Sequence, residues 1–166
     1  MRRIVSIAIA LSLSLFIYLF YRSEKTVVNE LMIFIISFDT YSAMRSNVIA
    51  MIALPESIVF SLPGGLWIFC VTMLSQQFYL KIGEQKIPLV IVPVLFAIGL
   101  EFCQLLHVTN GRFDVWDIVL YLLFWLIACD PFDSERPQQN MLFPFTLHSF
   151  IFLACFLSVY LAHVSQ

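Results

Sequence analysis

The chain has 166 residues, of which 61% are hydrophobic and 12% are charged, and its formal net charge is −2. The charged share is about half that of a typical soluble domain, which argues against a soluble core. The slightly acidic balance argues against nucleic acid as a partner, because phosphate backbones select basic surfaces. The length allows one transmembrane domain over residues 1–166 and no sizeable soluble domain.

Five apolar segments are each long enough to cross a hydrocarbon layer of ~30 Å at ~1.5 Å per helical residue. They cover residues 4–21, 57–80, 88–107, 114–130 and 143–163. The first begins after Met1-Arg2-Arg3, is too long for most signal peptides and lacks a small-x-small cleavage site, so we expect a retained span. These segments predict an all-α, polytopic bundle of about five transmembrane helices.

The stretch of residues 23–56 differs from these spans because charged residues interrupt it. Its apolar pieces, residues 31–38 and 48–54, are too short to cross a membrane. We expect one or two amphipathic helices on the membrane surface, with Arg45 solvated. The alternative is that Thr26–Phe38 forms a re-entrant segment.

The lysine and arginine residues of the loops indicate the orientation. A cytoplasmic N-terminus places five of them inside and four outside, and the short segments Arg2–Arg3 and Lys81–Lys86 favour this choice. We therefore expect the N-terminus in the cytoplasm and the junction between the third and fourth spans at the outer face of the membrane.

A polar cluster, defined as Glu101, Gln104, Arg112, Asp114 and Asp117, lies at this junction. Glu101 is roughly 9 Å below the end of the third span, so its carboxyl group must be protonated, paired or directed into a wet cavity. Gln104 follows three residues later on the same face of the helix. His107 lies at the rim and is a candidate base, although a lone rim histidine is more often a hydrogen-bonded surface residue.

The second half of the cluster follows an Asn-Gly turn that ends at Gly111. Asp114 is a good N-cap for the fourth span, and Asp117 falls in the first turn, where the helix dipole favours a carboxylate. With Tyr121, the two aspartates form one stripe at i, i+3 and i+7. Two structural explanations compete with a functional one: the aspartates only start a helix, and Glu101 only tethers Arg112.

Two kinds of chemistry fit the cluster. The guanidinium group of Arg112 suits a phosphate or carboxylate on a ligand, and neighbouring carboxyl groups suit acid–base work. The sequence has no nucleophile motif or metal-binding spacing, and its four cysteines lie in separate apolar runs. We therefore expect no metal or cofactor and assign no catalytic residue.

The run Leu62-Pro63-Gly64-Gly65-Leu66-Trp67 interrupts the second span. Proline and glycine pairs favour a kink or a broken helix, which membrane proteins tolerate where backbone groups line a cavity or meet other helices. Trp67 is either an anchor at the membrane interface or a packed core residue. Pro63 and Trp67 are therefore supporting residues of the predicted site, together with Gly111.

The pattern Glu101-x-x-Gln104, then Gly111-Arg112-Phe113-Asp114-x-x-Asp117, preceded by Leu62–Trp67, resembles the VanZ-like family of small bacterial membrane proteins. The resemblance covers about residues 55–130. The family's usual asparagine and glycine in the following helix are Tyr121 and Phe124 here, which puts a close helix approach through a small residue in doubt. The resemblance implies a protein of the bacterial cytoplasmic (inner) membrane whose outer-facing polar cluster acts on, or binds near, envelope lipids or cell-wall precursors. The named member of the family is associated with resistance to glycopeptide antibiotics of the teicoplanin type.

Three functions are compatible with these residues. The first is binding or modulation of a lipid-linked or glycolipid ligand, with Arg112 holding an anionic group above Glu101 and Gln104. The second is a membrane enzyme that uses Glu101 and Asp117 as acid and base. The third is a structural or partner-docking subunit, in which the cluster only locks two helices together. The oligomeric state is left open.

Overall fold

The computed structural model describes residues 2–22, 27–109, 112–129 and 138–164. Most of these residues are helical, as predicted. The helices are α1 (Arg2–Tyr21), α2 (Val27–Ile36), α3 (Phe38–Met51), α4 (Glu56–Ser75), α5 (Val92–Leu105), α6 (Val115–Ala128) and α7 (Leu147–Val164), with a 3-10 turn η1 (Leu89–Ile91) before α5. A small sheet of β1 (Phe78–Ile82), β2 (Gln85–Pro88) and β3 (Gln139–Asn140) was not predicted.

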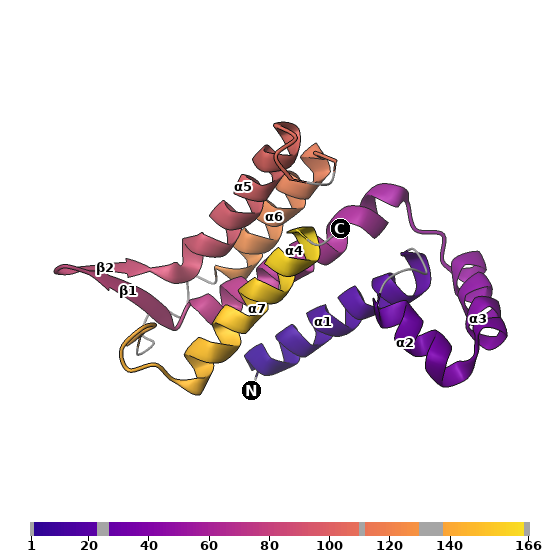
Figure 1. Cartoon of the computed structure of the whole chain (residues 1–166), viewed down its shortest axis with the longest axis horizontal. Coiled ribbons are helices and arrows are strands. Elements are labelled where there is room, and N and C mark those ends of the chain that lie inside the picture. Colours follow the sequence, from indigo (N-terminus) through magenta and orange to yellow (C-terminus); the bar gives the residue numbers. More distant parts are fainter. Residues whose placement is uncertain (1, 23–26, 110–111, 130–137, 165–166) are drawn as a thin grey trace.

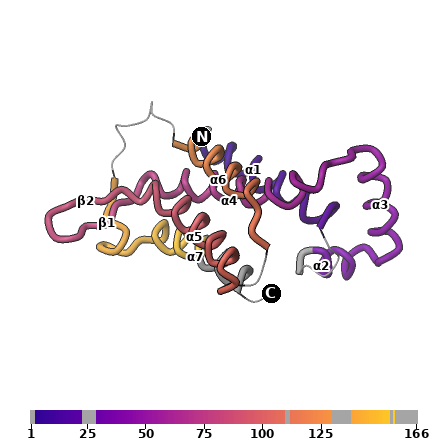
Figure 2. Tube along the Cα trace, turned by 90° about the horizontal axis from the view of Figure 1, so that it is seen from above, coloured from indigo at the N-terminus to yellow at the C-terminus, as the bar shows by residue number. Residues whose placement is uncertain are grey.

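Helix α4 is the centre of the bundle, since it contacts α1, α5, α6 and α7 (Figure 1). Two further parts extend from opposite ends of this bundle, the β1–β2 hairpin at one end and the helices α2 and α3 at the other (Figure 2). Successive helices of the bundle run antiparallel. One side of the bundle therefore holds the ends of α1 and α5 together with the starts of α4 and α6.

Two helices in the described ranges are long and apolar enough to cross a membrane, residues Arg3–Tyr21 and Glu56–Ser75. Helix α4 is half buried within the bundle, whereas few residues of α1 are. The helices of the third and fourth predicted spans are shorter than expected: the apolar helical stretch Leu89–Leu105 includes the 3-10 turn, and Val115–Ala128 has 14 residues. At ~1.5 Å per residue, α6 is about 21 Å long.

Of the kink and the break that we considered for the second span, the break does not occur, because α4 continues through Pro63. The glycines after Pro63 instead allow α6 to approach closely. A Cβ atom on Gly64 would lie 2.7 Å from the ring of Tyr121, and one on Gly65 would lie 2.5 Å from the ring of Phe124. Both distances are too short for real contacts, so the small residues on α4 accommodate the large ones on α6.

The second predicted span also ends earlier than expected, at Ser75 rather than Leu80. The following residues form β1, which pairs antiparallel with β2 and parallel with β3. Phe78 of β1 packs in a buried cluster with Val71, Leu89, Met141 and Phe152. Phe78 fills this core from a strand just as it could from a helix. Hydrophobicity alone therefore did not show whether this segment is a strand or a helix.

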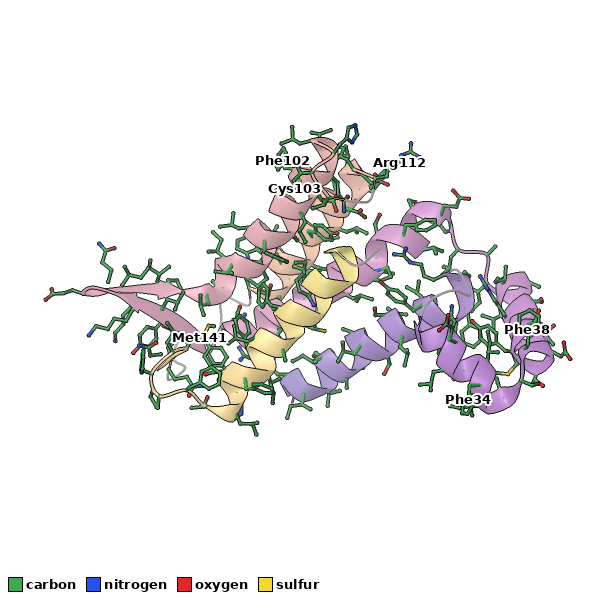
Figure 3. The ribbon with its side chains drawn as sticks, viewed as in Figure 1. Phe34, Phe38, Phe102, Cys103, Arg112 and Met141 are labelled. Carbon is green, nitrogen blue, oxygen red and sulfur yellow. The ribbon has the colours of Figure 1, made fainter. Side chains whose placement is uncertain are left out.

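The region after α1 forms two helices, within the one or two that we expected, and Figure 3 shows Phe34 and Phe38 on this part of the molecule, away from the bundle. Arg45 is half-buried rather than solvated. Its guanidinium group donates hydrogen bonds to the carbonyl oxygens of Phe20 (3.1 Å) and Arg22 (2.7 Å), and the Tyr41 hydroxyl donates to that of Leu19. The last carbonyls of a helix lack partners within it, so these side chains of α3 cap the end of α1.

Candidate functional site

The end of α5 is fixed by a Schellman motif. His107 adopts a left-handed conformation (φ 57°), its N–H donates to the carbonyl oxygen of Gln104 (3.0 Å), and the N–H of Val108 donates to that of Cys103 (2.8 Å). This pattern satisfies the last carbonyls of the helix and reverses the chain. His107 is exposed and is not among the residues lining the cavity described below, so it serves as a helix cap.

The start of α6 agrees with the prediction. Asp114 has an extended backbone (φ −133°, ψ 125°), and its side chain accepts a hydrogen bond from the N–H of Trp116 at 2.9 Å. The predicted N-cap is therefore confirmed, as is the position of Asp117 in the first turn. Both carboxyl groups lie at the positive end of the α6 dipole.

A cavity of about 870 Å³ lies between the ends of α1, α4, α5 and α6. It is lined by every member of the polar cluster, namely Glu101, Gln104, Arg112, Asp114 and Asp117. The supporting residues Pro63 and Trp67 also line it, whereas Gly111 lies outside the described residues. The stripe predicted on α6 is complete, because Tyr121 lines the cavity too.

Glu101 is the most deeply buried charged residue of the cavity, with 2% of its surface exposed. Its Oε1 atom accepts a hydrogen bond from the Tyr121 hydroxyl (3.3 Å), and its Oε2 atom accepts a long one from the Asp114 N–H (3.5 Å). These donors, and not Arg112, contact the carboxyl group, so the alternative in which Glu101 only tethers Arg112 is wrong. Arg112 is exposed at the tip of the α5–α6 pair (Figure 3).

Gln104 lies one turn beyond Glu101 on the same face of α5. It is 8% exposed and lines the cavity. Among the residues that the structure describes, none forms a hydrogen bond with its side-chain amide. The amide atoms of Gln104 are not among the fully buried side-chain atoms that lack a partner, so they face the cavity rather than being enclosed by protein. The amide is therefore available to a molecule in the cavity.

Two charged residues of the cavity, Arg22 and Glu56, were missed by the sequence analysis. Arg22 follows the last residue of α1, and Glu56 is the first residue of α4. The signal that would have found them is topological: in an antiparallel bundle, the end of the first span and the start of the second lie on the same side as the polar cluster. Glu56 was the last residue of the predicted surface region, and Arg22 immediately precedes that region.

The Arg22 side chain is held firmly. One terminal nitrogen donates to the carbonyl oxygen of Phe60 (3.0 Å), and the guanidinium group stacks on the rings of Tyr18 and Phe60, at 5.2 and 4.8 Å from their centroids. Arg45 of α3 donates a hydrogen bond to the backbone carbonyl oxygen of Arg22. Contacts from α1 and α4 thus position this guanidinium group at the cavity before any ligand arrives, and α3 holds the backbone of the same residue.

The side chains of the cavity suit the binding of a charged ligand. They combine carboxyl, amide, hydroxyl and guanidinium groups, and within the described ranges no three His, Cys, Asp or Glu residues are grouped to hold a metal ion. Comparisons with protein-family models, with curated proteins and with solved structures found no match to this chain. The cavity and its side chains are therefore what indicates a function.

Proposed function

We propose that this chain is a multi-pass protein of the bacterial cytoplasmic membrane that binds or modulates an envelope lipid or lipid-linked ligand through the cavity. Membrane insertion is supported by the two helices long enough to span and by apolar side chains on the outside of α1, such as Ile4 and Ile9, which are 75% and 63% exposed. Lipid is the solvent in which such a surface is stable.

The proposal rests on the side chains that line the cavity. At its mouth Arg112 offers a planar fork of N–H donors that matches phosphate or carboxylate oxygens, and below it the amide of Gln104 is open to a ligand. A volume of about 870 Å³ is within the range of small-molecule sites. The Glu101 carboxyl group accepts from Tyr121 and Asp114 rather than from Arg112, so the cluster is not held together by an ion pair between Glu101 and Arg112.

The resemblance to the VanZ-like family adds the cellular setting. We propose that the N-terminus is cytoplasmic, that the five apolar segments span, and that the cavity opens at the outer face, where lipid-linked cell-wall precursors are exposed. A role in resistance to teicoplanin-type glycopeptides is tested by comparing the susceptibility of cells with and without the chain.

The binding proposal is tested by the lipids that the protein retains. The chain is purified in nanodiscs of bacterial lipid, released in the mass spectrometer, and the bound lipids are identified by native mass spectrometry. We expect Arg112→Ala to lose at least tenfold in retained lipid. Arg112→Lys should restore only part of it, because an ammonium group supplies charge without the bidentate geometry.

The matched control is Lys81→Ala, which removes one exposed positive charge from β1, outside the cavity. It should retain lipid like the wild type. If Arg112→Ala folds normally and retains the same lipids in the same amounts as the wild type, the cavity is not the binding site and the proposal is wrong.

A further inference from the structure

Charges of both signs line the cavity. They belong to two arginines and four acidic residues, namely Arg22, Arg112, Glu56, Glu101, Asp114 and Asp117. A ligand with only negative charge would meet twice as many carboxyl groups as guanidinium groups. Because like charges at short distance cost free energy, the wall composition favours a ligand that carries a positive group as well as a negative one.

The two signs are arranged by depth. Glu101 is 2% exposed, and Tyr121 beside it is 8% exposed, whereas Arg112 is an exposed residue at the mouth. Arg22 is half-buried on the wall formed by α1. A ligand entering from the mouth would thus place its negative group beside the arginines and its positive group deeper, beside the carboxyl groups of α5 and α6.

The deep carboxyl group has room for a further donor. An ionised carboxylate offers about four acceptor positions, and the two hydrogen bonds that the structure gives Glu101, at 3.3 and 3.5 Å, come from neutral groups. Both are longer than the usual 2.7–2.9 Å of a charge-assisted bond. Gln104 as a residue is nine-tenths buried in the same wall, and its side-chain oxygen is a further acceptor for an N–H donor.

The mouth is apolar as well as charged. Phe60 and Val115 both line the cavity, and they are 54% and 61% exposed. An exposed apolar margin beside a polar cavity suits an amphiphile whose head group enters while its chains stay outside. A soluble ligand would gain nothing from this margin.

We propose, resting on the function proposed above, that the ligand is a zwitterionic phospholipid with a primary ammonium group. Its phosphate lies between Arg112 and Arg22, and its ammonium group donates hydrogen bonds to Glu101 and Gln104 and lies near Asp117. A phosphocholine head group has the same charges but no N–H donors, and a phosphoglycerol head group has no positive charge. The cavity therefore discriminates in the order ethanolamine, then choline, then glycerol.

The test is competitive retention by the full chain. The protein is exchanged into nanodiscs that contain equal amounts of phosphatidylethanolamine, phosphatidylcholine and phosphatidylglycerol with identical acyl chains, and bound lipids are counted by native mass spectrometry. We expect the wild type to retain at least ten times more phosphatidylethanolamine than phosphatidylglycerol. Equal or greater retention of phosphatidylglycerol, still dependent on Arg112, overturns this inference and leaves the proposed function intact.

The variant Glu101→Gln separates charge from shape, since the amide is nearly isosteric with the carboxyl group. We expect it to lose the preference for ethanolamine while Arg112-dependent retention of phospholipid continues. The matched control Glu84→Gln, in the exposed turn between β1 and β2, should keep the preference. A preference unchanged in Glu101→Gln overturns the assignment of the ammonium group to this carboxyl group.

Two measurements need no variant. Stepwise N-methylation of phosphatidylethanolamine removes one N–H donor at a time, and we expect retention by the wild type to fall at each step; retention independent of methylation overturns the inference. Glycerophosphoethanolamine, the same head group without acyl chains, should compete at least tenfold less well than the lipid. Equal competition would mean a soluble ligand and would overturn the choice of an amphiphile.

Discussion

The two ends of the helical bundle differ in what their polar side chains contact. At the end that holds the N-terminus of α1, the Arg3 guanidinium group donates to the side-chain oxygen of Gln76, and the Gln76 amide donates to the carbonyl oxygen of Ala128. At the other end, the polar groups of α5 and α6 line the cavity. At the Arg3 end, side-chain hydrogen bonds join α1, α4 and α6 to one another. At the cavity end, hydrogen-bond donors and acceptors face the cavity.

The difference separates structural from functional polar residues. Buried polar groups that satisfy one another stabilise a fold, and their removal leaves a partner unsatisfied. A polar group that faces the cavity without joining two helices, such as Arg112, contributes little to the fold and is available for a ligand. The comparison therefore predicts that Gln76 and Arg112, one from each end, change different quantities: stability for Gln76 and lipid retention for Arg112.

The largest effect on stability is expected where α4 and α6 meet beside the cavity. Gly65→Val places side-chain atoms where the ring of Phe124 lies, because even a Cβ atom would be 2.5 Å from that ring. We expect a loss of about 3 kcal/mol, at the upper end of typical overpacking. The measurement is unfolding by denaturant in mixed micelles.

Gly99→Val is the matched control, because a Cβ atom on Gly99 of α5 has no neighbour within 4 Å. It should unfold within ~1 kcal/mol of the wild type, since only helix propensity changes. If both valine variants unfolded alike, the close approach of α4 and α6 would not limit stability. A rescue of Gly65→Val by Phe124→Ala would identify the clash directly.

The next effect compares the two ends. Gln76→Leu removes the amide that links Arg3 to Ala128, and we expect a loss of about 1–3 kcal/mol because both partners lose a hydrogen bond. Retained lipid per folded molecule should not change. Arg112→Ala should behave in the opposite way, with unchanged unfolding and reduced lipid retention. A variant pair that changed both quantities together would remove the distinction between the ends.

Local rules predicted much of the cavity. Asp114 was recognisable as an N-cap from its place before an apolar run, and the spacing of Glu101 and Gln104 put both on one face of α5. The short connection between α5 and α6 then required their polar ends to meet. Each of these inferences spans only a few residues, where backbone geometry limits the outcomes.

Longer-range features could not be predicted in this way. Arg22 and Glu56 are separated from the polar cluster by many residues, so only the alternation of helices places them at the cavity. The glycines of α4 were interpreted as a break because their partners, Tyr121 and Phe124, lie on another helix. Arg45 was expected in solvent because the carbonyls that it caps belong to α1. In each case the deciding contact joins segments that sequence spacing does not relate.

A smaller effect is expected at the start of α6. Asp114→Ala removes the acceptor for the Trp116 N–H and should cost about 1 kcal/mol, typical of a lost N-cap. Asp114→Asn keeps an acceptor without the charge, so its stability should lie within a few tenths of a kcal/mol of the wild type. Equal destabilisation by both substitutions would show that the charge, rather than the cap, stabilises the helix.

The smallest effect is expected for Tyr121→Phe. The substitution removes the hydroxyl that donates to Glu101 but keeps the ring that packs against Gly64, so we expect a loss of about 0.5 kcal/mol, the lower end for one hydrogen bond. Combining it with Glu101→Gln in a double-mutant cycle measures how strongly the two side chains are coupled. Because the hydrogen bond is 3.3 Å long, the coupling should be under ~1 kcal/mol, with lipid retention preserved. A coupling of several kcal/mol would mean that Glu101 is held by Tyr121 as tightly as Gln76 is held at the opposite end, and its carboxyl group would then be a structural element rather than a free acceptor.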